Sequence, residues 1–169
     1  VDYNLLMQPK VEAEVAFVLK SDLPSVEISE AALVDAIDYA VASIEIVGSR
    51  VENWDIRITD TIADNASASH FVLGTQHVNL ADLDLVGCEM KLWLNEEIVS
   101  EGKGEACMGS PINAALWLAN TMVKRGKPLK AGDVILSGAL GPMAPVKPGD
   151  KVRASIEGLG DVAVNFSTI

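Results

Sequence analysis

Three glutamates in predicted β-strands are the residues of this sequence best suited to chemistry. Glu12 and Glu14 lie in residues 9–19, a segment rich in valine and other large apolar residues that predicts a strand. Side chains alternate between the two faces of a strand, so both carboxylates point the same way, roughly 6.5–7 Å apart. Glu45 lies between two isoleucines in residues 43–47, a second segment that predicts a short apolar strand.

Carboxylates in apolar surroundings cost several kcal/mol unless a cation meets them. For Glu12 and Glu14 a solvated sheet face is the simplest alternative, and for Glu45 it is an ion pair with Arg50 or Lys10. Three such glutamates, with no matching buried lysines nearby in the sequence, favour a hard divalent cation. Oxygen ligands suit Mg²⁺, Mn²⁺ or Ca²⁺, and a three-carboxylate site with open positions suits Mg²⁺ best.

A glycine-rich segment in the last third of the chain is a weaker candidate. Residues 138–142 lack the spacing and the following helix of a dinucleotide-binding fingerprint. The segment could offer backbone N–H groups to an anion, and Ser137 before it could donate to a carboxylate. From the pattern alone, both are best interpreted as parts of a turn.

The elements that must position these residues form a mostly β pattern. Ser29, as N-cap, predicts a helix over residues 30–42, and Ser110 with Pro111 predicts a helix that ends before Gly126. Between them, residues 49–69 form a long polar segment. Loops of this length in a compact domain are usually functional. The sequence favours the α+β class, a mixed and mostly antiparallel β structure with two main flanking helices. Further strands are expected at residues 70–73, 87–94, 97–101, 134–137, 151–156 and 162–166.

Composition limits the class of protein. The 169 residues fit a single domain, and a 49% hydrophobic content indicates a globular chain. A net charge of −11 argues against partners such as nucleic acid or an anionic membrane, and no window is long and uncharged enough to span a bilayer. Cys88 and Cys107 make neither a disulfide framework nor a zinc spacing, so we expect small buried residues in a reducing cytoplasm.

Four motifs, in order, carry a resemblance to a known family. Together they resemble the 2-keto-4-pentenoate hydratase group of the fumarylacetoacetate hydrolase superfamily, over about residues 6–167. The motifs are Gln8-Pro-Lys-Val-Glu-Ala-Glu-Val-Ala16, Ile44-Glu-Ile-Val-Gly-Ser-Arg50, Asp60-Thr-Ile-Ala-Asp-Asn-Ala-Ser67 and Ile135-Leu-Ser-Gly-Ala-Leu-Gly-Pro-Met143.

The resemblance implies one catalytic domain over residues 1–169, a β-sandwich or roll of the fumarylacetoacetate hydrolase C-terminal type. It implies a hydro-lyase that hydrates 2-hydroxypenta-2,4-dienoate (2-keto-4-pentenoate) to 4-hydroxy-2-oxopentanoate in the catabolism of aromatic compounds, and a homo-oligomer. It further implies Mg²⁺ or Mn²⁺ on Glu12, Glu14 and Glu45. Ser137 and the Gly138 loop would hold the substrate carboxylate. Arg50, Asp64 and Ser67 are the next candidates for the pocket wall.

Two departures from the family pattern leave other functions open. Family members carry an N-terminal segment with a lysine thought to act in catalysis, which this sequence does not match, and Ser110 stands where relatives often have histidine. We therefore expect a missing N-terminal segment. The nearest alternative activity is 4-oxalocrotonate decarboxylase or another 2-oxo acid hydratase or hydrolase of the superfamily. A further alternative is a truncated chain that binds metal without turnover.

Overall fold

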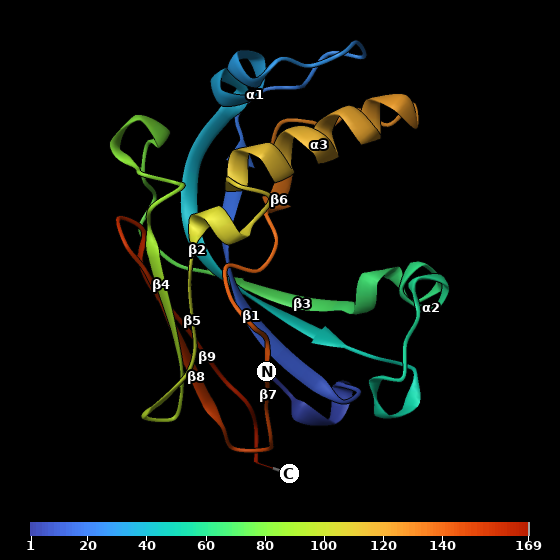
Figure 1. Ribbon diagram of the computed structural model, residues 1–169, viewed down its shortest axis with the longest axis vertical. Coiled ribbons are helices and arrows are strands. Elements are labelled where there is room, and N and C mark those ends of the chain that lie inside the picture. Colours follow the sequence, from blue (N-terminus) through green and yellow to red (C-terminus); the bar gives the residue numbers. More distant parts are fainter. Residues whose placement is uncertain (169) are drawn as a thin grey trace.

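The computed structural model describes residues 1–168, which form two β-sheets and three α-helices (Figure 1). The helices are α1 (Glu30–Ala36), α2 (Ile58–Ala63) and α3 (Pro111–Lys124). The strands are β1 (Pro9–Leu19), β2 (Ile37–Gly48), β3 (Ala68–Leu73), β4 (Glu89–Leu94), β5 (Glu97–Lys103), β6 (Val134–Leu136), β7 (Ala144–Pro145), β8 (Lys151–Ile156) and β9 (Gly160–Asn165). The predicted α+β, mostly antiparallel architecture is confirmed.

Strand β1 is the axis of the first sheet, whose order is β3-β2-β1-β6, with β7 also paired to β1. On one side β1 pairs with β2 along its whole length. On the other side it pairs with β6 at residues 16–18 and with β7 at Lys10 and Val11. Residues 137–143 connect these two short strands, so the chain leaves regular sheet pairing beside residues 12–15 of β1.

The core lies between the first sheet and the second, whose order is β5-β4-β8-β9 (Figure 1). Alternate residues of β1 enter this core, and Val11, Val15 and Phe17 are fully buried in it. Because side chains alternate along the strand, Glu12 and Glu14 must project from the opposite face. The second sheet lies to the left of β1 in Figure 1, so the glutamate face looks to the right.

Helix α3 begins and ends as its sequence predicts. The Ser110 hydroxyl accepts a hydrogen bond from the Ile112 N–H, and Pro111 occupies the first helical position. At the other end Gly126 has φ +70°, and the Lys127 N–H donates to the Met122 carbonyl, as in a Schellman motif. Within residues 1–168, no helix has both the length and the apolar composition needed to cross a membrane.

The prediction of a helix over residues 30–42 is wrong beyond Ala36. Ser29 caps α1 as expected, but β2 begins at Ile37 and continues to Gly48. The β-branched and aromatic residues Ile37, Tyr39 and Val41 suit a strand, and pairing with β1 from residue 37 onward outweighs the local helical pattern. The long polar segment also contains a helix that its sequence did not predict, α2.

Candidate metal centre

The three glutamates predicted to bind metal converge on the face of the first sheet that points away from the core. The register of β1 and β2 places Glu12 directly opposite Glu45, and Glu14 opposite Ser43. One carboxylate oxygen from each of Glu12, Glu14 and Glu45 lies within 4.8 Å of the others. Oxygens bound about 2.1–2.4 Å from one ion can lie at most about 4.2–4.8 Å apart, so the cluster is close to the size that a cation requires.

No protein cation within residues 1–168 neutralises this cluster, because none of the ion pairs there involves the three glutamates. The two cations that could have paired with Glu45 are engaged elsewhere. Arg50 Nε lies 3.4 Å from Asp64 Oδ1, and the Lys10 ammonium lies over the Trp54 ring, 4.1 Å from its centroid. The ion-pair alternative is therefore wrong. Glu14 is also only 1% exposed, which excludes a solvated sheet face for that side chain.

Burial raises the pKa of all three carboxyl groups, and charge repulsion adds to this for Glu12 and Glu14. The pKa of Glu14 is raised to about 9, mainly by burial and in addition by the charges of Glu45 and Glu12, while the hydrogen bond from the Gly138 N–H opposes the shift. The pKa of Glu12 is raised by burial and then by the charge of Glu45, and that of Glu45 by burial. Like charges directly opposite each other on neighbouring strands are destabilising. A divalent cation would remove this repulsion, so the donor set fits a hard metal ion.

The glycine-rich loop reaches the centre through its backbone. The Gly138 N–H donates to Glu14 Oε2 at 2.7 Å. The Ser137 and Leu140 N–H groups donate to the carbonyls of Val15 and Ala13, each at 3.0 Å, which holds the loop against β1. Ser137 is nearly buried, and its hydroxyl donates to the Gly138 carbonyl at 3.3 Å. The structure thus brings Ser137 next to the glutamate cluster.

The other three predicted site residues form their own group where β2 ends and β3 begins. Asp64 accepts hydrogen bonds from the Arg50 backbone N–H and the Ser67 hydroxyl, both at 3.2 Å. The Arg50 guanidinium also donates to the carbonyls of Gly48 and Ala68, at 3.1 and 3.4 Å. These contacts brace the polar segment against the sheet. A role for Arg50, Asp64 and Ser67 in contacting substrate stays a prediction.

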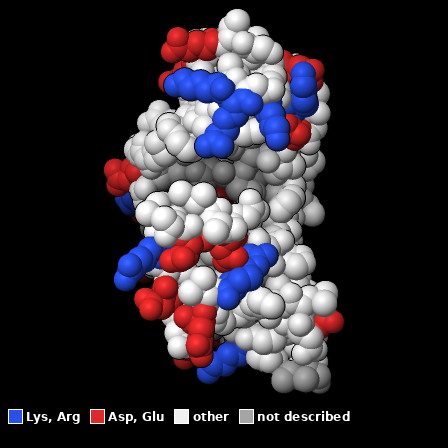
Figure 2. All heavy atoms as spheres, turned by 90° about the vertical axis from the view of Figure 1, so that its right-hand side faces the viewer, with Lys and Arg blue, Asp and Glu red and all other residues white. Residues whose placement is uncertain are grey.

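The face that carries the glutamates is hollowed. Figure 2 shows this face, with a recess between the helix end at the top and the α2 region below it. Lysine and arginine side chains gather on the upper rim, at the end of the molecule where α3 finishes. Lys124, Arg125 and Lys127, at the end of α3, are all exposed. An anion approaching the recess would therefore pass cationic side chains, despite the strongly negative net charge.

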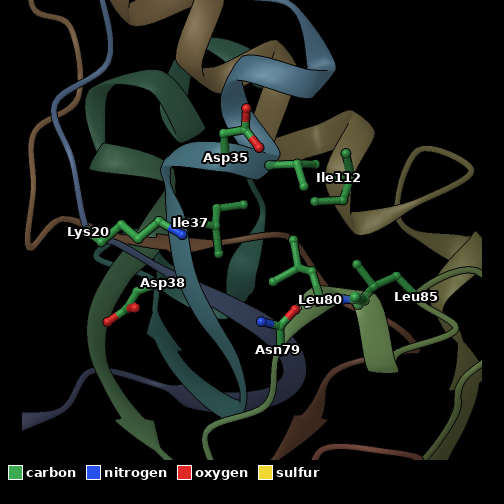
Figure 3. Close-up of a pocket in the computed structure, with 10 residues that line it drawn as sticks. Lys20, Asp35, Ile37, Asp38, Asn79, Leu80, Leu85 and Ile112 are labelled. Carbon is green, nitrogen blue, oxygen red and sulfur yellow. Dashed lines mark hydrogen bonds between the residues drawn. The ribbon is translucent and has the colours of Figure 1, made fainter.

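A separate pocket of about 370 Å³ does not include the glutamates. It lies where β1 ends and β2 begins, and Figure 3 shows Lys20, Asp38 and Asn79 among the polar side chains around it. About eight residues of extended strand separate Lys20 from Glu12, which corresponds to roughly 26 Å. We therefore take the carboxylate cluster, and not this pocket, as the candidate functional site.

Two contributors to the centre were not predicted from the sequence. The Gly138 N–H was considered as a donor to an anion, but the anion that it meets in the structure is Glu14. Cys107 was expected only to fill space, and it is buried as expected, yet its thiol donates to the Ser137 carbonyl at 2.8 Å. Burial raises the pKa of the Cys107 thiol, which keeps it protonated and able to donate. A contact across 30 residues leaves no local signal in the sequence.

Known proteins resemble this chain over nearly its whole length. Residues 5–167 match the family model described as fumarylacetoacetate (FAA) hydrolase C-terminal. The chain is 56% identical over 162 residues to 2-keto-4-pentenoate hydratase 1 of Dechloromonas aromatica, covering 96% of this chain and 62% of that protein. It is 43% identical to 2-hydroxyhexa-2,4-dienoate hydratase of Comamonas testosteroni, covering 96% of this chain and 61% of that protein. The resemblance to the 2-keto-4-pentenoate hydratase group is confirmed.

A solved structure shares the fold. The 4-oxalocrotonate decarboxylase of Pseudomonas putida G7, complexed with magnesium and adipate, aligns with a TM-score of 0.92 at 34% identity, over 98% of this chain and 63% of that chain. The match over nearly all of its length shows that this chain belongs to the fumarylacetoacetate hydrolase C-terminal family. This chain spans less than two thirds of the length of these relatives.

Proposed function

We propose that this protein is a hydro-lyase that uses a divalent cation to hydrate 2-hydroxypenta-2,4-dienoate to 4-hydroxy-2-oxopentanoate in the catabolism of aromatic compounds. The observation that carries this proposal is the cluster of Glu12, Glu14 and Glu45, three carboxylates within 4.8 Å that no cation of the described residues neutralises. The identity of 56% to a 2-keto-4-pentenoate hydratase supports the choice of substrate.

The metal that we propose for this site is Mg²⁺ or Mn²⁺. Glu12, Glu14 and Glu45 would hold it through carboxylate oxygens, the ligands that hard divalent cations prefer. The bound ion would supply Lewis-acid stabilisation of the negative charge that develops on the 2-oxo oxygen as the dienol tautomerises and water adds to the conjugated double bond. The magnesium in the decarboxylase structure supports this assignment.

The remaining predicted residues would bind and orient the substrate. Ser137 lies beside the glutamate cluster, and we assign its hydroxyl to binding the substrate carboxylate. The carboxylate would accept the hydrogen bond that the hydroxyl now donates to the Gly138 carbonyl. Arg50, Asp64 and Ser67 would form the wall at the end of β2, where they already hold one another through hydrogen bonds. The exposed cations at the end of α3 would attract the anionic substrate toward the recess.

Loss of the dienoate's ultraviolet absorbance tests the activity. Purified protein with Mg²⁺ is expected to deplete this absorbance, and Glu45→Gln is expected to abolish the depletion because it removes one charged ligand. Glu97→Gln is the matched control, since Glu97 is an exposed glutamate at the start of β5. No depletion by the parent protein with Mg²⁺ or Mn²⁺ would contradict the hydratase assignment and leave a metal-binding chain without turnover.

A second candidate is 4-oxalocrotonate decarboxylase, which the fold match favours at a TM-score of 0.92. The identity is lower than to the hydratase, 34% against 56%, so we rank it second. Release of CO₂ from 4-oxalocrotonate, with no hydration of the dienoate, would reverse this order.

Two further expectations belong to the proposal. We expect a cytoplasmic protein, and the free thiols of Cys88 and Cys107 agree with a reducing compartment. We also expect a homo-oligomer, as the family resemblance implies.

A further inference from the structure

One peptide group of the glycine-rich loop is held from both sides. The carbonyl of Ser137 accepts a hydrogen bond from the Cys107 thiol, with 2.8 Å between Sγ and O. The N–H of Gly138 belongs to the same peptide group and donates to Glu14 Oε2 at 2.7 Å. Because a trans peptide directs its carbonyl and its N–H in opposite directions, the thiol and the carboxylate face each other across this group.

The backbone around Cys107 fixes the position of the thiol. The Cys107 N–H donates to the Gly104 carbonyl at 3.1 Å, and the Ser110 N–H donates to the Cys107 carbonyl at 2.9 Å. Ser110 is also the N-cap of α3. Cys107 is 5% exposed, so its thiol has little freedom to turn toward water. The start of α3 thus holds the donor that meets the loop.

The loop itself leaves no room for another arrangement. Gly138 has φ +109°, a conformation that side chains other than hydrogen rarely allow. A Cβ at Gly138 would lie 3.3 Å from Cys107 Sγ, so the thiol packs directly against this residue. The Ser137–Gly138 peptide group can rotate only if one of its two hydrogen bonds breaks.

We propose that Cys107 is a positioning residue for the metal centre, which acts on Glu14 through the Ser137–Gly138 peptide group. By holding the Ser137 carbonyl, the thiol keeps the Gly138 N–H directed at Oε2 and leaves the other Glu14 oxygen free for the cation. The inference rests on the proposed metal centre. Groups that orient ligands in this way typically change metal affinity by about 10- to 100-fold when removed.

Three variants test this role by calorimetric titration with Mn²⁺, alongside the melting temperature without metal. Cys107→Ala removes the donor and is expected to weaken Mn²⁺ binding about tenfold. Cys107→Ser is similar in size to alanine but keeps a donor, and is expected to restore affinity to within about threefold of the parent. Cys88→Ala is the matched control, because Cys88 is equally buried but its thiol lies 3.7 Å from the Leu85 carbonyl, away from the glutamates.

A thiol that merely fills space would give a different pattern. Cys107→Ala and Cys88→Ala would then lower the melting temperature alike and leave Mn²⁺ affinity unchanged, and that result would overturn the inference while the metal centre stands. Equal weakening in Cys107→Ala and Cys107→Ser would overturn it too. If the parent binds no Mn²⁺, the proposed centre fails and this inference falls with it.

A second measurement reads the Cys107 hydrogen bond directly. In Cys88→Ala the S–H stretching band of Cys107 can be observed alone. We expect it at lower frequency than the Cys88 band in Cys107→Ser, because the Cys107 thiol makes the shorter hydrogen bond. We also expect a shift on Mn²⁺ addition, because the charge on the far side of the peptide group changes. Equal frequencies and no response to Mn²⁺ would overturn the inference.

Discussion

Glu14 is the residue at which burial and charge oppose each other most strongly. It is 1% exposed, lies near two other carboxylates and receives a hydrogen bond from the Gly138 N–H. A buried carboxyl group stays neutral by keeping its proton, and the pKa of Glu14 is accordingly raised to about 9. Alternatively, a bound cation can neutralise the carboxylate in place of the proton. We therefore expect the cluster to lose a proton when it binds a cation.

This exchange predicts that metal binding releases protons. At pH 7 a Glu14 carboxyl with a pKa of about 9 is protonated in the metal-free protein, and it must lose the proton to become a ligand. We expect about one proton released per Mn²⁺ bound, and apparent affinity that rises by up to about tenfold per pH unit between pH 6 and 8. Calorimetry in buffers of different ionisation enthalpy measures the protons released. A value of zero would contradict the assignment of Glu14.

At the scale of elements, the interrupted partner of β1 creates the site. Strands β6 and β7 pair with the two ends of β1 and leave its centre to the loop of residues 137–143. A continuous strand there would direct its backbone N–H groups at the carbonyl groups of β1, in the plane of the sheet. The interruption lets Gly138, with its positive φ, donate to a side chain instead.

Gly138→Ala tests the contribution of this loop. Alanine at φ +109° is strained, and its Cβ would crowd Cys107 Sγ. We expect Mn²⁺ affinity to fall by about tenfold or more as the N–H turns away from Glu14. Gly132→Ala is the control, since Gly132 also has positive φ but a Cβ there would meet nothing within 4 Å. Equal Mn²⁺ affinity in the two variants would refute a special role for this glycine.

The sequence indicated much of this arrangement, and its failures have physical causes. Alternation in residues 9–19 predicted β1 with its true bounds, and the same alternation placed Glu12 and Glu14 on one face. The end of the first helix was misplaced because residues 37–42 satisfy a local helical pattern until pairing with β1 decides their conformation. The contact between Cys107 and Ser137 could not be predicted, because it depends on how α3 and the loop pack together.

At the scale of the whole molecule, the carboxylate cluster should control how stability changes with pH. A carboxyl group whose pKa is higher in the folded state than in the unfolded state stabilises the fold at low pH, and this contribution is lost as pH rises through the folded pKa. Burial raises the pKa of all three glutamates above the ordinary 4.5, and that of Glu14 to about 9. The metal-free protein should therefore lose stability as pH rises from about 5 to 9.

Melting temperatures across this pH range, with EDTA and with Mg²⁺, measure the effect. We expect a falling profile in EDTA and a flatter one in Mg²⁺, because the cation replaces the lost protons. Glu14→Gln, which resembles the protonated carboxyl group, should flatten the EDTA profile on its own. Parallel profiles for the parent and Glu14→Gln in EDTA would argue against the raised pKa.

The surface suggests where a second copy could bind. Ile58 and Ile62 on α2 are 72% and 73% exposed, and Phe71 on the neighbouring edge strand β3 is 50% exposed. We expect these side chains to be covered in a homo-oligomer, since apolar patches of this kind mark interaction sites. Light scattering should give a mass above that of one chain, and Ile58→Glu with Ile62→Glu should lower it. A parent that remains a monomer at high concentration would contradict the expectation.

The central claim is that one divalent cation binds among Glu12, Glu14 and Glu45. Anomalous diffraction from crystals grown with Mn²⁺ tests it most directly. The predicted result is a single strong peak about 2.1 Å from one oxygen of each carboxylate, which disappears in Glu45→Gln and persists in Glu97→Gln. A peak elsewhere, or one that survives the loss of Glu45, would contradict it.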